Sequence, residues 1–270
     1  MDFSDWIGNN LVKRDVITAR MVNHFKHTLG EHCFDEPEVP AGLHWCLAPD
    51  VVEPDGLGPD GHPKLGGFLP NIPYPRRMWA GGWLEFHGDF GIGDEVEKRS
   101  VIDDISFKSG NSGNLCFVAV THEFSVNGKL KLRERHDIVY REEVTKPPAI
   151  DPLPDTHADQ RWHVDTNEVM LFRYSALTFN GHRIHYDLPY STGVEGHGGL
   201  LVHGPLQATL MLNLAAVSAG CLPKHMSYRG VRPLVCGAPV MVDANNAEGA
   251  FETCVRGDDG NITTRGTATI

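Results

Sequence analysis

The sequence HGPLQATLMLNLAAVSAG, residues 203–220, is the longest apolar segment of the chain that carries helix signals at both ends. Gly204 and Pro205 open it, and Pro is favoured in a first helical turn because its missing N–H needs no partner there. Gly220 follows it, as is common just after a helix ends. The apolar run is interrupted by the polar residues His203, Gln207 and Asn213. A membrane span needs about 18 apolar residues, so we predict a long helix over 203–219 in a protein core.

Segments of β character stand on both sides of this helix. The stretch 95–140 carries turn signals at Asn111-Ser112-Gly113 and at Asn127-Gly128, and Asn-Gly between two strands is a strong hairpin signal. Three shorter β-like runs follow the helix, over 240–244, 250–256 and 262–270. From the pattern alone, the chain combines helical segments with β-rich ones.

A proline-rich segment divides the chain near its middle. Residues 146–155, KPPAIDPLPD, hold four prolines, which exclude the interior of a helix or sheet. We therefore expect one domain over 1–150 and a second over 151–270. A shift of 150 residues lays the helix-like segment 15–29 on 165–179, which opens with a capping-box pattern. The chain reads as two copies of one module, although a repeat this faint leaves coincidence equally open.

Composition narrows the class of partner. The chain has 270 residues, with 24 Lys and Arg against 35 Asp and Glu, and a formal net charge of −11. Nucleic-acid binding needs clustered basic residues, so we expect no such partner. The six Cys form no C-x-x-C pair and two acids stand near the N-terminus, so we expect a cytoplasmic protein, with the mitochondrial matrix as the less favoured alternative.

Two polar segments are candidates for chemistry. The first, NGHRIHYD over 180–187, sets an amide, two imidazoles, a guanidinium and a carboxylate in a predicted loop. A solvated loop is the equally open alternative. The second, 196–205, is Gly-rich and leads into the start of the predicted helix, where free N–H groups and the helix dipole favour negative charge. Close packing of a buried helix also explains its glycines.

The segment FRYSALTFNGHRIHYD, residues 172–187, resembles the motif of MaoC-like double hot-dog enoyl-thioester hydratases. It is most similar to the branch of mesaconyl-C4-CoA and itaconyl-CoA hydratases and hydroxyacyl-thioester dehydratase type 2. LLVHGPL over 200–206 and PRRMWAGG over 75–82 resemble the same branch. The resemblance implies an α+β double hot-dog, two antiparallel sheets that each wrap a helix. The short, Gly-studded stretch 79–93 suggests that the N-terminal helix is degenerate.

The resemblance also implies a hydration mechanism. In the family, an acid and a His bind one water and add it across the α,β-double bond of an acyl thioester. His185 matches the family His, whereas Asn180 takes the place of the acid, and an amide can orient water but cannot take its proton. His182 or Asp187 could therefore share the acid–base work. The N–H of Gly204 is expected to polarise the thioester carbonyl.

The N-terminal half lacks this pair, because Asn180 and His185 fall on Gly30 and Asp35 at the 150-residue shift. We expect it to be non-catalytic and to shape the acyl pocket.

The acyl group is less defined by the sequence. A dicarboxylic acyl group needs a cation for its free carboxylate, and Arg183 is the best-placed candidate, followed by Arg76 and Arg77. The alternative is that these arginines bridge the two halves or contact the phosphates of coenzyme A. His182 and His203 are further candidates for substrate binding.

The predicted function is that of a hydro-lyase acting reversibly on a short-chain, dicarboxylic enoyl-CoA such as mesaconyl-C4-CoA or itaconyl-CoA. A 3-hydroxyacyl-thioester (fatty acyl) dehydratase, a hot-dog acyl-CoA thioesterase and an acyl-CoA-binding protein remain as alternatives. We expect no metal and no cofactor, because coenzyme A is part of the substrate. No membrane partner is expected, and a monomer and a homodimer are both compatible with the sequence.

Overall fold

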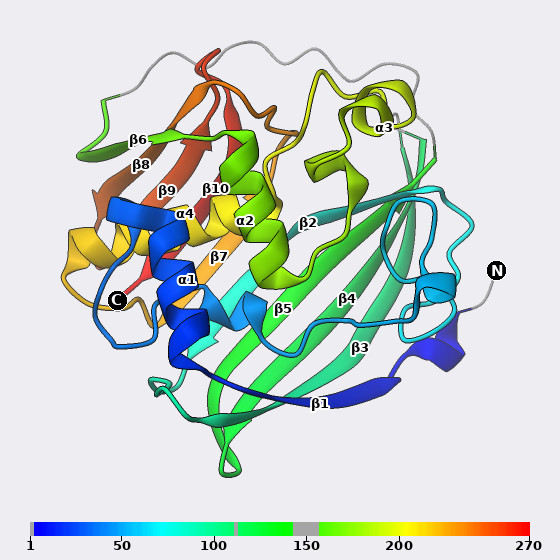
Figure 1. Ribbon diagram of the computed structural model, residues 1–270, viewed down its shortest axis with the longest axis horizontal. Helices are drawn as coiled ribbons and strands as arrows, with labels where there is room; N and C mark the ends of the chain where they lie inside the picture. Colours follow the sequence, from blue (N-terminus) through cyan, green and yellow to red (C-terminus); the bar gives the residue numbers. More distant parts are fainter. Residues whose placement is uncertain (1–2, 111–112, 143–156) are drawn as a thin grey trace.

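One antiparallel sheet of ten strands dominates the computed structural model, which describes residues 3–110, 113–142 and 157–270 (Figure 1). The strands run in the order β1-β3-β4-β5-β2-β7-β10-β9-β8-β6. Those of the N-terminal half are β1 (Asn10–Val16), β2 (Arg76–Phe86), β3 (Glu95–Gly110), β4 (Gly113–Val126) and β5 (Lys129–Arg141). Those of the C-terminal half are β6 (Gln160–Asp165), β7 (His225–Gly230), β8 (Pro239–Ala247), β9 (Ala250–Arg256) and β10 (Ile262–Thr269).

Read inward from the two edges, the halves have equivalent orders, β1-β3-β4-β5-β2 and β6-β8-β9-β10-β7. Each strand of the first half therefore has a counterpart in the second. β1 leads into α1 (Ala19–Leu29), just as β6 leads into α2 (Glu168–Thr178). The two helices contact each other beside the sheet (Figure 1). These elements lie about 150 residues apart, so the structure confirms two copies of one module. The two expected sheets are continuous, because β2 pairs with β7 from Gly81↔Arg229 to Glu85↔His225.

The predicted long helix is α4 (Gly204–Ala219), with His203 as its N-cap residue. All its residues from Leu206 to Ala216 are buried, so the sheet wraps around it. Its polar side chains are paired inside the core. Gln207 Oε1 accepts hydrogen bonds from the hydroxyls of Thr263 and Thr264 at 2.7 and 2.8 Å.

The N-terminal half has no counterpart of α4 among its described residues. The segment 30–75 holds only short 3₁₀ turns: η2 (Gly30–His32), η3 (Leu43–Cys46) and η4 (Pro54–Gly56). The stretch 79–93 was expected to leave little room for a second central helix, and the structure agrees, because 79–86 belongs to strand β2. Asn213 of α4 binds the N-terminal segment, accepting from the N–H of Phe34 at 2.9 Å and donating to the carbonyl of Ala41 at 3.1 Å.

Several predicted boundaries shift. The first helix begins at Ala19 with Thr18 as its cap, since the residues before it lie in β1. Asn167 caps α2 by accepting from the N–H of Met170. The proposed domain boundary near residue 150 lies outside the described residues. Among the helices that the structure describes, none has the length and apolar character to cross a bilayer.

A loop of the N-terminal half lies directly on the polar segment 180–187. The backbone N–H of Arg183 donates to the carbonyl of Asp60 at 2.9 Å, and its guanidinium donates to the carbonyl of Pro59 at 3.0 Å. Gly61 has φ +87°, and a Cβ there would lie 2.0 Å from the carbonyl oxygen of Gly181. Only glycine fits this approach.

Gly61→Ala is therefore expected to destabilise the protein by about 1–3 kcal/mol, through both the clash and the left-handed backbone. Gly66→Ala is the matched control, because Gly66 has φ +93° but its nearest neighbour would be Asn71 Cβ at 4.0 Å. Urea unfolding of the two variants checks the prediction. Equal losses of unfolding free energy would contradict the close contact.

Candidate functional site

His185 is the buried centre of the polar segment. It ends the 3₁₀ turn η5 (Arg183–His185) and is 6% exposed. Its Nδ1 lies 2.8 Å from the carbonyl oxygen of Leu201. A carbonyl can only accept, so Nδ1 carries the proton and Nε2 is left as an acceptor. Burial lowers the pKa of His185 to about 4, so the ring is neutral at pH 7 and can take a proton.

A second imidazole lies flat against this ring. The rings of His185 and His203 are 3.6 Å apart at 18°, and His203 Nε2 is 2.8 Å from the hydroxyl of Ser175. Burial holds the pKa of His203 well below its ordinary value. His203 directly precedes Gly204, the first residue of α4, and the first N–H groups of a helix have no partner within it. The neutral rings and this helix start therefore share one site.

Trp79 of β2 covers the start of α4. A Cβ on Gly204 would lie 2.5 Å from Trp79 Cε3, so the contact requires glycine. The indole stacks on Tyr228 at 4.7 Å. Its Nε1 is buried and has no hydrogen-bond partner within the described chain. A donor without a partner thus lies in the wall next to the helix N-terminus.

Asn180 does not contact His185 through any hydrogen bond of the described residues. Its Oδ1 accepts from the N–H of His182 at 3.0 Å, and its own N–H donates to the carbonyl of Ser175 at 2.9 Å. The His182 ring lies 5.5 Å from the His185 ring, edge to face. Burial, with the neighbouring imidazoles, lowers the pKa of His182 to about 2.

Asp187 serves the structure of the loop. It binds the Arg183 guanidinium at 2.7 Å and caps α3 (Leu188–Gly193) by accepting from the N–H of Tyr190. The Arg183 guanidinium also lies 4.1 Å from the Tyr190 ring centre. Arg183, which the sequence favoured as the arginine for the substrate carboxylate, is thus already paired with Asp187.

The other two candidate arginines differ in their partners. Arg76 binds the carboxylate of Glu195 and the carbonyl of Val194. Arg77 has one long ion-pair contact, 3.5 Å from Nη2 to Asp60 Oδ2, and its guanidinium also interacts with the Tyr140 hydroxyl. Arg77 faces Tyr140 across the β2–β5 ladder, and the Tyr140 hydroxyl is buried. Arg77 is the least engaged of the candidate cations.

Two residues of the site were missed by sequence reasoning, namely Asp60 and His62. His62 Nδ1 lies 3.1 Å from Asp60 Oδ2, and the His62 ring lies 4.3 Å from that of His182. They stand in a Pro- and Gly-rich segment with no periodic signal, 120 residues from the motif. Asp60, His62 and His182 also offer one possible metal ligand each, within 4.8 Å of one another.

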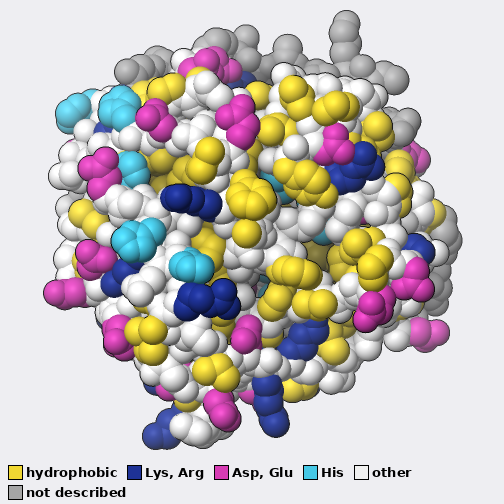
Figure 2. All heavy atoms as spheres, viewed as in Figure 1, with side chains coloured by type: hydrophobic (Ala, Val, Ile, Leu, Met, Phe, Trp, Pro, Cys, Tyr) yellow, Lys and Arg dark blue, Asp and Glu magenta, His cyan; other side chains and the backbone are white. Residues whose placement is uncertain are grey.

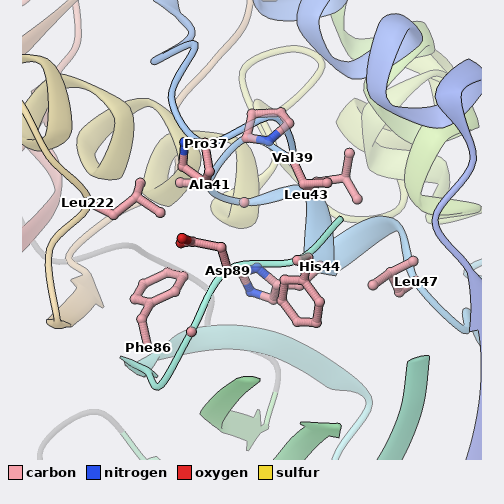
Figure 3. Close-up of a pocket in the computed structure, with 13 residues that line it drawn as sticks. Pro37, Val39, Ala41, Leu43, His44, Leu47, Phe86, Asp89 and Leu222 are labelled. Carbon is pink, nitrogen blue, oxygen red and sulfur yellow. The ribbon is translucent and has the colours of Figure 1, made fainter. Parts of the chain in front are cut away.

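A small cavity lies elsewhere, between the N-terminal segment and the far end of α4 (Figure 3). Its volume of about 20 Å³ suits a single water, and Pro37, His44, Phe86 and Leu222 are among its walls. None of the motif residues lines it, so it is not the acyl site. On the face that carries α1 and α2, the space-filling view shows a recess bordered mainly by hydrophobic side chains (Figure 2).

Comparisons with known proteins show the family of the chain. Residues 42–236 match the family model of hydroxyacyl-thioester dehydratase type 2. The chain is 39% identical over 265 residues to a mesaconyl-C(4)-CoA hydratase of Chloroflexus aurantiacus, covering 96% of this chain and 94% of that protein.

Two solved structures share the fold. A MaoC-like dehydratase has a TM-score of 0.75 at 11% identity, covering 100% of this chain and 99% of its own. A Mycobacterium tuberculosis protein described as a double hotdog fold has a TM-score of 0.58 at 12% identity, covering 97% and 96%. The expected α+β double hot-dog is confirmed. The chain belongs to the hydroxyacyl-thioester dehydratase type 2 family and, as its motif predicts, is a hydro-lyase.

Proposed function

We propose that this protein adds water reversibly across the α,β-double bond of a short-chain, dicarboxylic enoyl-CoA, such as mesaconyl-C4-CoA or itaconyl-CoA. The observation that carries the proposal is the neutral His185, whose Nδ1 is fixed by the Leu201 carbonyl beside the start of α4. The similarity to a mesaconyl-C(4)-CoA hydratase over 96% of the chain supports the same reaction.

The proposed mechanism uses groups of the chain alone. His185 Nε2 takes a proton from water while the water oxygen bonds to C3 of the acyl group. The electron pair of the double bond moves toward the thioester oxygen, where the N–H of Gly204 and the positive end of the α4 dipole stabilise the enolate. His185 then returns the proton to C2. No step needs a cofactor beyond the coenzyme A of the substrate.

The free carboxylate of the substrate has donors on one face of β2 and β5. Arg77 and Trp79 are two residues apart on β2, so they share a face, and Tyr140 pairs opposite Arg77. The Trp79 Nε1 is buried without a partner in the described chain, and the Tyr140 hydroxyl is buried beside the Arg77 guanidinium. An unpaired buried donor is costly. A carboxylate would satisfy the indole N–H, whereas a purely aliphatic chain would leave it unpaired.

Aromatic packing behind Trp79 supports a short acyl group. Trp79 lies against Tyr228 and, edge to face, against Trp45 at 6.2 Å. Trp45 Nε1 donates to Glu134 at 2.6 Å, and the Tyr228 hydroxyl also donates to Glu134 at 3.4 Å. This fixed wall opposes extension of the acyl chain past Trp79.

We further propose a division of labour between the halves. The motif side chains and Gly204 form one catalytic site in the C-terminal half, over 151–270. The N-terminal half, over 1–150, shapes the acyl pocket through Arg77, Trp79 and Tyr140. A cytoplasmic protein, monomeric or homodimeric, fits this arrangement. Dehydration of a 3-hydroxyacyl thioester is the second candidate, because the matched family model carries that description.

His185→Ala is expected to lower kcat for hydration by about 10²-fold or more, because the proton acceptor is lost. The measurement is the loss of enoyl-thioester absorbance with mesaconyl-C4-CoA. His27→Ala, an exposed position on α1, is the matched control and should retain the activity of the parent protein. Unchanged turnover in His185→Ala would refute the assignment.

The pH dependence follows from the pKa of His185, which burial lowers to about 4. The group remains an acceptor from pH 8 down to about pH 5, and kcat/KM should fall only as the pH approaches 4. Stability behaves differently, since the unfolded chain binds more protons between the lowered pKa and the ordinary value of about 6.5. Unfolding free energy therefore decreases as pH falls through that window.

Initial rates taken after brief dilution into each buffer, with circular dichroism at the same pH, separate loss of activity from unfolding. An acid limb of kcat/KM near pH 6.5 in folded protein would contradict the lowered pKa.

A thioester panel tests the substrate class. We expect kcat/KM to be highest for mesaconyl-C4-CoA or itaconyl-CoA, lower for crotonyl-CoA, and lowest for enoyl-CoA with longer aliphatic chains. Tyr140→Phe should raise KM for the dicarboxylic substrates several-fold, since one donor is lost. The same variant should leave KM for crotonyl-CoA unchanged, which serves as the internal control. A preference for long chains would favour the fatty-acyl dehydratase instead.

A further inference from the structure

We propose that the N-terminal half does more than shape the acyl pocket, and that its Asp60 and His62 supply a second group to the site of the C-terminal half, acting with His185 on the reacting water. This inference rests on the proposed hydration function. It answers a chemical gap, because the amide of Asn180 can orient water but cannot take its proton. The amide oxygen of Asn180 is already bound by the N–H of His182 at 3.0 Å.

Asp60 fixes the orientation and tautomer of His62. One carboxylate oxygen, Oδ2, is 3.1 Å from His62 Nδ1, and the other, Oδ1, accepts from the His62 backbone N–H at 3.1 Å. A carboxylate only accepts, so Nδ1 carries the proton and Nε2 is an acceptor. His185 is held in the same way by the Leu201 carbonyl. The site thus has two imidazoles with an anchored Nδ1 and an available Nε2.

The rings of His62 and His185 both neighbour the ring of His182. The His62 ring lies 4.3 Å from His182, and His182 lies 5.5 Å from His185. The loop that carries Asp60 and His62 is fixed there by the backbone of Arg183, which donates to the Asp60 carbonyl at 2.9 Å. The pair therefore belongs to the wall of the catalytic site, although it comes from the other half of the chain.

Charge also favours this role. Burial alone would raise the pKa of Asp60, but the hydrogen bonds from His62 and the positive charge of Arg77 lower it below its ordinary value. Asp60 is ionised at neutral pH. Burial dominates at His62 and lowers its pKa, opposed by the hydrogen bond to Asp60. The site then holds neutral imidazoles beside one carboxylate, which compensates positive charge that develops during the reaction.

In the proposed hydration step, water contacts both imidazoles. One O–H of the water donates to His62 Nε2 and stays on oxygen, while the proton of the other O–H passes to His185 Nε2 as oxygen bonds to C3. The double-bond electrons form the thioester enolate. The His185 imidazolium, stabilised by the Asp60 carboxylate, then gives its proton to C2. The product carries the hydroxyl on C3, and all side chains return to their first state.

The test compares kcat and KM with mesaconyl-C4-CoA or the best substrate of the panel. His62→Ala and His62→Gln should lower kcat by about 10²-fold and change KM less than about twofold. Asp60→Asn should lower kcat similarly, because an amide permits the wrong tautomer of His62. Asp60→Glu should recover part of it. Added imidazole should restore activity to His62→Ala, an effect that a merely structural role would not produce.

His87→Ala is the matched control, because His87 is also paired with a carboxylate, Glu85 at 3.3 Å, but lies outside the site. It should keep the parent kcat. Full kcat in both His62 variants, with an active parent protein, would overturn the inference alone. A parent protein that hydrates no enoyl-CoA would overturn the proposed function. Activity lost with EDTA and restored by Zn²⁺ would make Asp60, His62 and His182 metal ligands and overturn the pair's role.

Discussion

The antiparallel pairing of β2 with β7 is the constraint on which the rest of the structure depends. It joins the two halves at the centre of one sheet, from Gly81↔Arg229 to Glu85↔His225. Edge strands that are left unpaired are prone to aggregate, and this junction covers the inner edge of both halves. It also places the face of β2 that carries Trp79 against the first residue of α4. The catalytic loop and the acyl wall can therefore come from different halves.

The N-terminal half, which lacks a central helix in the part that the structure describes, holds a network of buried polar groups beside its apolar core. Glu134 is 1% exposed and binds His136 at 2.5 Å as well as Trp45 and Tyr228. His122 extends the network to Ser100. Burial would raise the pKa of Glu134, but the neighbouring imidazoles hold it well below its ordinary value. A buried carboxylate with several donors fixes its neighbours rigidly, which explains how Trp79 is supported without a helix behind it.

Local signals explain which parts of the structure the sequence predicts. The helix signals around 203–220 and the Asn127-Gly128 hairpin act within a few residues, and both features occur in the structure as α4 and the β4–β5 turn. The motif residue His185 was identified from its local segment in the same way, and its catalytic role stays a prediction.

Long-range features were not accessible from these signals. β2 lies in a Gly-containing segment that reads as a poor strand, and only its pairing with β5 and β7 stabilises it. The same holds for Asp60 and His62, whose meaning depends on a contact with Arg183 more than 120 residues away. The sequence likewise does not show that Arg183, the arginine favoured for the substrate, is paired with Asp187.

The hydrogen bonds of Asn213 with Phe34 and Ala41 affect the order in which the parts of the molecule fold. These hydrogen bonds join residues 179 and 172 positions apart, and contacts of such separation form late because the intervening loop must first be closed. During synthesis the N-terminal strands appear long before α4 leaves the ribosome. The segment around Phe34 and Ala41 therefore stays uncovered by α4 until the last third of the chain has been made. The candidate active site of the enzyme is completed only in the final stage of folding.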